Sequence, residues 1–403
     1  MTSITPYPSV NEILLNVSNR INHILRENLI GLYLFGSLSY GDFNLNNSDI
    51  DLVAIVSTPL SLHELEQIRQ LHQKIGEEYP VWRDRLECSY TPVELLINIM
   101  PPKNPRPYYG GGIFYDEATY GNEWIINNYL LYEHGISLIG PDCKKLISPI
   151  DIIEVQKACI RDLFQEWEPK IIDFDWLDNS HYQSYLVMNL CRILYTVMCG
   201  SVGTKKLSAA WVINKFELPW SNLIAIAASW KYGDEMFSRN EVIDFIKFTI
   251  DTIEQTMLFH DMYPDEKRYG IRHIADFLDR IIAWAKTNKE ITGVVLVGSY
   301  ARNQAKKDSD IDLVILTNKA DKYISDCEWL KQFGEIQNIK SINYGALTSW
   351  HVNYKNNHEV EFGITMPNWT DIPVEQGTRE VVNGGIIILH DPRGLFRKLM
   401  ADI

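Results

Sequence analysis

The sequence predicts an α+β chain in which two mixed domains of strands and helices flank a helical bundle. The chain has 403 residues, enough for two or three domains, since a domain commonly takes about 100–200 residues. A segment near the N-terminus recurs near the C-terminus, which predicts a repeated domain. The residues between the two copies follow a helical pattern of apolar positions, which predicts the bundle.

The repeat relates residues 31–56, GLYLFGSLSYGDFNLNNSDIDLVAIV, to residues 293–317, GVVLVGSYARNQAKKDSDIDLVILT. Each copy has an apolar run, Gly-Ser, a polar loop, Ser-Asp-Ile-Asp-Leu-Val and a second apolar run. Short runs rich in Leu, Val and Ile that end at Gly or a polar cluster are typical of buried strands. We therefore expect strand, loop and strand twice, with a helix before each copy, over Val10–Leu29 and Ile274–Thr287.

Between the copies, from about residue 150 to residue 257, apolar residues recur at spacings of three and four, as in amphipathic helices. The clearest stretches are 153–167, 185–198, 209–216 and 242–257. Prolines 141, 149 and 169 interrupt the start of this region. We predict three domains, over residues 1–145, 146–260 and 261–403.

Composition narrows the possible partners. The net charge is −14, which argues against a protein that grips a nucleic-acid backbone and suits a cationic small substrate. The N-terminus does not read as a signal peptide, and no apolar run is long enough to cross a membrane. The six cysteines include no CxxC pair and are expected to be reduced thiols. We expect a cytoplasmic protein, monomer or dimer, that needs neither a membrane nor a structural zinc.

The Asp-Ile-Asp element suggests metal chemistry. Asp49 and Asp51 are two apart on an expected strand, so both carboxylates lie on one face. Mg²⁺ prefers oxygen ligands and shares them with substrate phosphates, and a pair of ions can clamp the attacking and leaving oxygens. Gly36 allows close approach of the backbone to a ligand. We predict two Mg²⁺ ions at this site, with Gly36, Ser37 and Ser48 as nucleotide-binding residues.

A third carboxylate is expected as a metal ligand or as a base. Glu87, in the extended-looking run Leu86–Tyr90, is the candidate in the first copy. The corresponding residues of the second copy are Gly298, Ser299, Asp310, Asp312 and Glu361, with Glu359 as a same-face neighbour of Glu361. Two alternatives remain open. The aspartates could be ordinary loop caps and surface charges, or the second copy could serve only as a scaffold.

These motif residues resemble the nucleotidyltransferase superfamily that includes DNA polymerase beta. Within it, residues 1 to about 258 resemble the streptomycin/spectinomycin adenylyltransferase family. Beyond the metal motif, the residues that carry this resemblance are Gly112-Ile113-Phe114, His134 to Pro141, Leu190 to Tyr195, Lys205 before Ala209-Ala210-Trp211, and Tyr232-Gly233. The resemblance implies a nucleotidyltransferase (DNA polymerase beta-like) domain followed by an α-helical bundle domain.

The resemblance also implies an activity, the Mg²⁺-dependent transfer of AMP from ATP to a hydroxyl of an aminoglycoside or aminocyclitol antibiotic, which confers resistance. Glu87 would be the base, and Lys205 and Tyr232 would contact the nucleotide phosphates. Trp176, Asp178 and His181 are the candidates for drug contacts. The use of ATP rather than GTP rests on the resemblance alone. The family's tryptophan-containing drug region is not matched, because Pro101–Tyr109 has no Trp, so the drug stays open.

Residues from about 265 to 403 resemble stand-alone nucleotidyltransferase domains. The resemblance rests on Glu361-Phe362-Gly363, Thr378, Val382, Gly384-Gly385 and Asp391-Pro392-Arg393-Gly394. This second nucleotidyltransferase domain lacks an obvious substrate wall, so we expect one drug-modifying site. Two alternative functions remain. The acceptor could be a protein or a tRNA, or one of the two domains could be a non-catalytic nucleotide-binding module.

Overall fold

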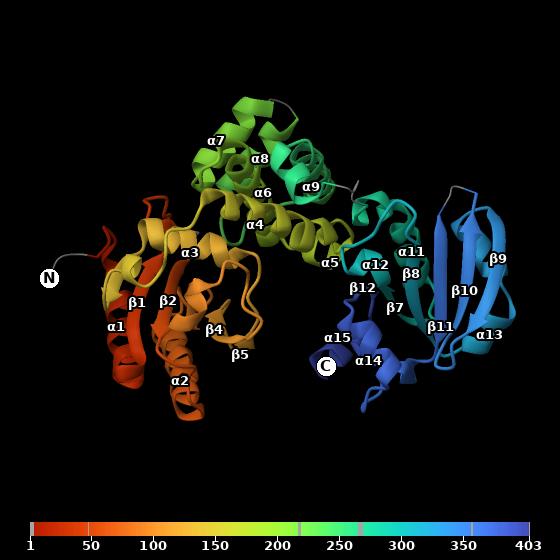
Figure 1. Cartoon of the computed structure of the whole chain (residues 1–403), viewed down its shortest axis with the longest axis horizontal. Helices are drawn as coiled ribbons and strands as arrows, with labels where there is room; N and C mark the ends of the chain where they lie inside the picture. The colour runs from red at the N-terminus through yellow and green to blue at the C-terminus, as the bar shows by residue number, and fades with distance from the viewer. Residues whose placement is uncertain (1–3, 47, 217–218, 265–268, 356–357, 403) are drawn as a thin grey trace. The chain divides into compact units, whose positions relative to one another are not determined.

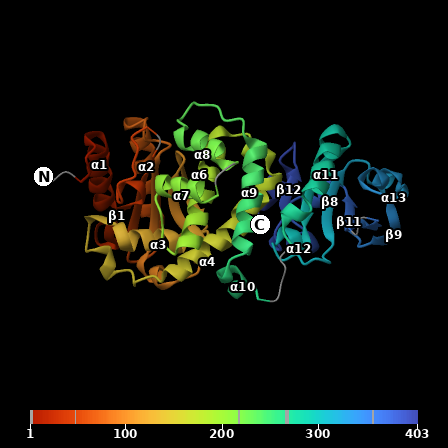
Figure 2. The same cartoon turned by 90° about the horizontal axis from the view of Figure 1, so that it is seen from above.

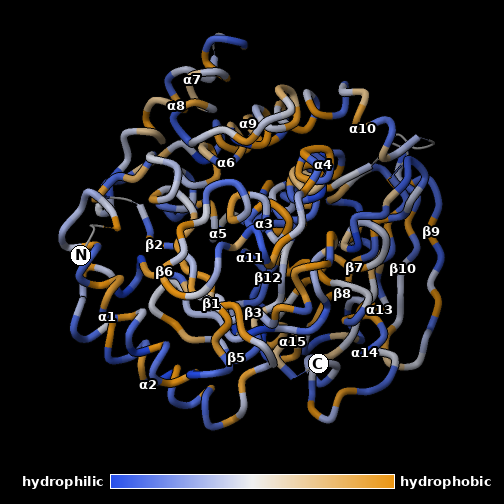
Figure 3. The backbone as a smooth tube through the Cα atoms, turned by 60° about the vertical axis from the view of Figure 1, so that its left-hand side comes forward, coloured by the Kyte–Doolittle hydropathy of each residue, from blue (hydrophilic) through white to orange (hydrophobic). Residues whose placement is uncertain are grey.

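Each copy of the repeat lies at the centre of a six-stranded sheet (Figure 1). In the first copy, β1 (Leu29–Phe35) pairs antiparallel with β2 (Ile50–Val56). In the second copy, β7 (Ile291–Val297) pairs in the same way with β8 (Ile311–Thr317). These central strands are mostly hydrophobic (Figure 3), because both of their faces are covered. The predicted strand, loop and strand are confirmed in both copies.

The two sheets share the same pattern of parallel and antiparallel neighbours, but the chain runs through the three outer strands in opposite orders. Their strand orders are β6-β1-β2-β3-β4-β5 and β12-β7-β8-β11-β10-β9. In each sheet the pair that includes the Asp-Ile-Asp strand and its outer neighbour is parallel, and the other pairs are antiparallel. The likeness of the two domains therefore extends to the arrangement of their strands, but the order in which the chain visits the outer three differs. The remaining strands are β3 (Leu86–Pro92), β4 (Arg106–Gly110), β5 (Ile113–Ala118), β6 (Ile136–Ile139), β9 (Ile336–Asn343), β10 (Thr348–Tyr354), β11 (Glu359–Thr365) and β12 (Ile387–His390).

This computed structural model describes residues 4–402, except 47, 217–218, 265–268 and 356–357. No helix within these residues is both long and apolar enough to cross a membrane. The helices are α1 (Pro8–Leu25), α2 (Leu62–Glu78), α3 (Glu123–His134), α4 (Ile152–Asp162), α5 (Phe174–Leu177), α6 (Ser180–Cys199), α7 (Lys205–Phe216), α8 (Trp220–Ser229), α9 (Arg239–Glu254), α10 (Met257–Met262), α11 (Ala275–Thr287), α12 (Gly298–Ala301), α13 (Ala320–Ser325), α14 (Gln376–Asn383) and α15 (Leu395–Asp402).

The chain divides into two compact units whose boundaries differ from the three predicted domains. The first unit consists of Met1–Leu163, Ser180–Phe245 and Thr252–Phe259. The second consists of Phe164–Asn179, Ile246–Asp251 and His260–Ile403. The first sheet and most of the helical region thus form one unit, while two short pieces of the helical region belong with the second sheet.

In the first unit, both faces of the sheet are packed. Along β1, Leu32 faces a core shared with α1 and α2, and the next residue, Tyr33, faces a second core that contains Trp124 of α3. This alternation is the period of a strand. The predicted first helix ends at Leu25, because Leu29 already begins β1.

The predicted helices between the repeats are confirmed, with one change. Helices α6, α7 and α8 pack side by side (Figure 2). The α-helix predicted over 153–167 ends at Asp162. The chain then forms a π-helical turn over Leu163–Trp167 and a 3-10 turn over Glu168–Ile172, which contains Pro169. Proline lacks the N–H that a continuing α-helix requires.

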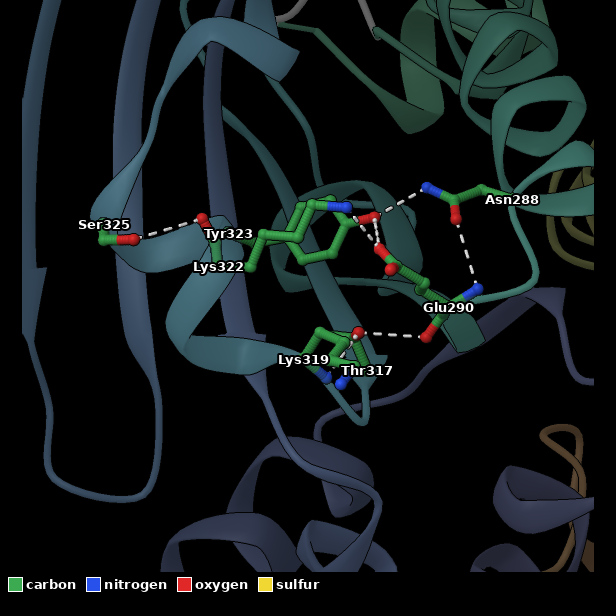
Figure 4. Close-up of polar contacts among 7 residues, drawn as sticks. All are labelled: Asn288, Glu290, Thr317, Lys319, Lys322, Tyr323 and Ser325. Atoms are coloured by element: carbon green, nitrogen blue, oxygen red, sulfur yellow. Dashed lines mark hydrogen bonds and ion pairs between the residues drawn. The ribbon is translucent and has the colours of Figure 1, made fainter.

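In the second unit, a polar network joins α13 to the start of β7 and the end of β8 (Figure 4). The hydroxyl of Tyr323 donates to Glu290 at 2.9 Å and accepts from Asn288 Nδ2 at 2.7 Å. Thr317 Oγ1 donates to the Glu290 carbonyl at 2.9 Å. The network fixes the end of the β7–β8 pair that is opposite to the Gly-Ser turn.

Candidate active site

The glycine of each Gly-Ser turn lies against the second aspartate of the motif. Gly36 has a φ of +68°, and a Cβ atom there would come within 1.9 Å of Asp51 Oδ2. Gly298 has a φ of +70°, and a Cβ atom there would come within 1.8 Å of Asp312 Oδ2. A left-handed φ and this close approach both require glycine. The turn therefore brings the backbone directly onto a carboxylate in both copies.

The serine before each Asp-Ile-Asp closes the polar loop. Ser48 Oγ accepts from the backbone N of Asn44 at 2.9 Å. Ser309 Oγ accepts from the backbone N of Lys306 at 2.8 Å in the second copy. The Ser48 hydroxyl thus has a structural use, and its contact with a nucleotide stays a prediction.

The predicted third carboxylates lie beside the second aspartates. On the parallel strand pairs, Glu87 of β3 is opposite Asp51, and Glu361 of β11 is opposite Asp312. The Tyr108 hydroxyl donates to Glu87. The sequence therefore placed both glutamates at equivalent positions of the two sheets.

Burial and mutual repulsion change the acidity of the first three carboxylates. Burial, followed by the charge of Glu87, raises the pKa of Asp49 to about 7. The same two causes raise the pKa of Asp51 well above its ordinary value. Burial also raises the pKa of Glu87. Asp49 Oδ1 is buried without a hydrogen-bond partner among the described residues. A repulsive set with an unsatisfied oxygen fits a hard cation such as Mg²⁺.

The helical region contributes cations to this site. Lys205, the first residue of α7, and Arg192 of α6 both act against the rise in the pKa of Asp51. Lys205 is exposed as a residue, yet the loss of water around its ammonium lowers its pKa. The charge of Arg192 lowers this pKa further, and the carboxylates of Asp49, Asp51 and Asp42 raise it. Lys205 therefore lies close enough to the aspartates for their charges to act on it, and its contact with the nucleotide phosphates stays a prediction.

Two arginines at the site were not predicted. The side chain of Arg85 is 9% exposed, and its Nε lies 3.9 Å from Asp49 Oδ1. Its guanidinium also donates to the Ser48 carbonyl and lies 4.5 Å from the centre of the Trp82 ring. Arg192 interrupts an otherwise apolar run on α6, and this irregularity is the sequence signal that could have identified it.

The other residues predicted to contact the nucleotide or the drug are divided between the two units. Tyr232 is 45% exposed and packs on His181 with ring centres 5.1 Å apart, within the first unit. Trp176 and Asp178 belong to the second unit, where the Lys170 ammonium lies 4.9 Å from the centre of the Trp176 ring. The structure does not bring these three drug-contact candidates, Trp176, Asp178 and His181, into one unit.

The second site has the tighter set of carboxylates. One ligand oxygen from each of Asp310, Asp312 and Glu361 lies within 4.8 Å of the others, and Asp49, Asp51 and Glu87 form no such set among the described residues. Burial, then the neighbouring aspartates, raises the pKa of Glu361 to about 7, and burial and Asp310 raise that of Asp312 to about 7.

A buried histidine lies behind this set. His351 Nδ1 is 2.7 Å from Glu361 Oε1, and its Nε2 is 3.3 Å from the hydroxyl of Tyr344. Neither residue was predicted, although His351 is directly opposite Glu361 on the neighbouring strand. The pair orients the third carboxylate of the second site.

Both domains combine a glycine turn against a carboxylate, one aspartate just before a strand and a second within it, and a glutamate on the parallel neighbour. This fold and site define a nucleotidyltransferase. Comparison with family models matches residues 18–96 to a nucleotidyltransferase domain, residues 145–252 to the C-terminal domain of aminoglycoside adenylyltransferase, and residues 271–366 to streptomycin adenylyltransferase. In three successive segments the chain is therefore similar to the aminoglycoside (spectinomycin/streptomycin) adenylyltransferase family. The predicted resemblance is confirmed, and the likeness of the second half is more specific than expected.

Curated relatives match a little over half of the chain. A spectinomycin 9-adenylyltransferase of Staphylococcus aureus is 24% identical over 230 residues, which are 53% of this chain and 82% of the relative. That of Enterococcus faecalis is 25% identical over 270 residues, 58% of this chain and 95% of the relative. An aminoglycoside (3'') (9) adenylyltransferase of Escherichia coli is 24% identical over 238 residues, 53% and 82%. A crystal structure of a spectinomycin adenyltransferase from Enterococcus faecialis with ATP and spectinomycin matches with a TM-score of 0.49 and 21% identity, over 60% of this chain and 99% of that chain.

Proposed function

We propose that the chain transfers AMP from Mg-ATP to a hydroxyl of an aminoglycoside or aminocyclitol antibiotic, at the site of Asp49, Asp51 and Glu87. The observation that carries this proposal is the opposition of charges in the first unit. Lys205 acts on all three carboxylates that fit a metal, and Arg192 acts on Asp51. The site therefore offers ligands for a metal-bound triphosphate and cations for the pyrophosphate that leaves. The relatives described above support an antibiotic as the acceptor.

Each residue has a task in this reaction. Bound Mg²⁺ would supply positive charge at the reacting phosphate, held by Asp49 and Asp51. Glu87 accepts the proton of the attacking hydroxyl, and its raised pKa suits a group that must take up a proton near neutral pH. Lys205 and Arg192 stabilise the negative charge of the departing pyrophosphate.

The acidic chain suits a cationic drug. The net charge of −14 favours the approach of a polycationic aminoglycoside. We propose His181 and Tyr232 as part of the drug or nucleotide surface of the first unit.

Pyrophosphate release with streptomycin, spectinomycin and related drugs tests the proposal. Asp49→Asn is expected to lower the rate by orders of magnitude, because it removes one carboxylate of the metal pair. Asp310→Asn, the matched change in the second domain, is expected to leave that rate close to wild type. No turnover of any drug by folded wild-type chain with Mg²⁺ would overturn the proposal. Loss of turnover in both variants would instead show two coupled sites.

A second nucleotide site in the C-terminal domain is the alternative that a specific observation favours. The close spacing of Asp310, Asp312 and Glu361 supports it. Mg-ATP binding by the Asp49→Asn variant, and its loss in the Asp49→Asn, Asp310→Asn double variant, would establish that site. If a cell lysate with labelled ATP then yields a labelled protein or tRNA, the acceptor is a macromolecule. Binding without labelling or drug turnover would make the domain a non-catalytic module.

A further inference from the structure

The loop after the first Gly-Ser turn contacts the start of α7. The Asp42 side chain is only 10% exposed, and its Oδ1 lies 3.4 Å from Lys206 Nζ. Its Oδ2 lies 3.5 Å from the backbone N of Lys206, which is a long contact. Both contacts are with Lys206, which is in the first turn of α7 next to Lys205. This carboxylate therefore lies where the helix dipole favours negative charge.

On its other side, Asp42 is fixed to the turn that carries Ser37. The backbone N of Asp42 donates to the Ser37 carbonyl at 3.1 Å. Gly41, just before it, has a φ of +81° and has no atom within 4 Å of a Cβ placed on it. The glycine therefore turns the chain, and Asp42 is the residue that makes the contact with α7.

The helix has no acidic residue of its own at this end. The first turn of α7 contains no Asp or Glu, and within the helix start the backbone N of Leu207 donates to Thr204 Oγ1 at 3.1 Å. Asp42 thus supplies from a distant loop the negative charge that a first-turn residue often supplies. A largely buried carboxylate is costly without such partners.

The second copy anchors the same corner of its loop by different chemistry. The backbone N of Gln304 donates to the Ser299 carbonyl at 2.8 Å, so Gln304 is equivalent to Asp42. Asn303, equivalent to Gly41, also has a positive φ of +59°. Its Nδ2 donates to the Phe164 carbonyl at 2.7 Å within the second unit. In both units, therefore, this corner contacts a segment that follows the first domain in the sequence.

We propose that Asp42 is a positioning residue that anchors the start of α7 to the metal-binding loop, so that Lys205 faces Asp49 and Asp51. Its effect on nucleotide binding rests on the proposed function. Its effect on the helix does not, because the contact exists in the chain without any ligand. Asp42 itself touches neither metal nor phosphate in this role.

The test uses the full chain and Asp42→Ala, with Asp151→Ala as the matched control. Asp151 accepts from the backbone N of Ile153 at 2.9 Å, so its loss removes a cap from α4 but leaves α7 untouched. Hydrogen exchange without ligand is expected to quicken at the first turn of α7 in Asp42→Ala only. Mg-ATP is expected to bind about five- to tenfold more weakly to Asp42→Ala, from the loss of one helix-end contact. Asp42→Asn, which keeps the shape, is expected to lose less.

A double-variant cycle on Mg-ATP binding identifies the route of the effect. If Asp42 acts through Lys205, adding Asp42→Ala to Lys205→Ala changes the Kd less than twofold. Additive effects, or exchange at α7 equal in Asp42→Ala and Asp151→Ala, would overturn the proposal. If α7 loosens as expected but wild-type chain neither binds Mg-ATP nor modifies a drug, the anchor stands and the proposed function fails.

Discussion

Replacement of Gly36 by alanine tests whether the turn after β1 sets the position of Asp51. Two costs can be separated. The left-handed φ of +68° costs a residue with a Cβ about 1–2 kcal/mol of folding stability. The new Cβ would also lie 1.9 Å from Asp51 Oδ2 and 2.8 Å from its Cγ. Rotation of the carboxylate relieves only the first contact, so the side chain as a whole must move.

The displacement predicts the size of the catalytic loss. Contacts of real Cβ atoms below 3.0 Å are essentially never seen, so Asp51 or the turn must shift by roughly 1 Å, and a misplacement of this size in an active site can cost about 100-fold. That factor corresponds to about 2.7 kcal/mol in kcat/KM. The assay is drug-dependent pyrophosphate release, with the free energy of unfolding measured in urea for the same variants.

Gly200→Ala is the matched control. Gly200 has a φ of +65°, and the atom nearest to a Cβ placed on it is Gln156 Nε2 at 3.9 Å. This variant should lose similar stability and keep its activity. If Gly36→Ala has a kcat/KM within threefold of that of Gly200→Ala, the reasoning about Asp51 is refuted.

Three further predictions concern charged groups of the two sites. Glu87→Gln should lower kcat by about 10²–10⁴-fold with little change in KM, because general base catalysis contributes that much; initial rates measure this, and the exposed Glu94→Gln is the control. Arg192→Ala should slow pyrophosphate formation and weaken Mg-ATP binding, which calorimetry measures; wild-type binding would show that Arg192 has no role at the phosphates. The metal-free chain should lose stability as the pH rises from about 4 to about 7, because in the folded state the pKa of Asp312 and that of Glu361 are both raised to about 7. These groups keep their protons when folded and release them when unfolded, so their contribution is complete below pH 4. Glu361→Gln should flatten this dependence in urea unfolding curves, and an unchanged slope would contradict the cause.

The parts of the site that depend on local patterns could be predicted from the sequence. A period of two places Asp49 and Asp51 on one face, and the extended-looking run Leu86–Tyr90 marks the strand that contains Glu87. Arg192 could not be placed in this way, since only tertiary packing brings α6 to the first sheet. The assignment of Trp176 to the second unit depends on how the chain is shared between units, which no local pattern records.

The division of the chain has a consequence for any attempt to separate its two halves. Glu168 is 1% exposed, and its Oε1 lies 3.3 Å from Arg272 Nη1, with both residues in the second unit. A polypeptide ending near residue 260 would keep Phe164–Asn179 but lack the second sheet, which is in the same unit as that segment. Glu168 would then lose its ion pair with the guanidinium of Arg272. Loss of one partner of a buried ion pair costs about 3–5 kcal/mol if the other stays buried. The N-terminal half is therefore expected to be poorly soluble when expressed alone.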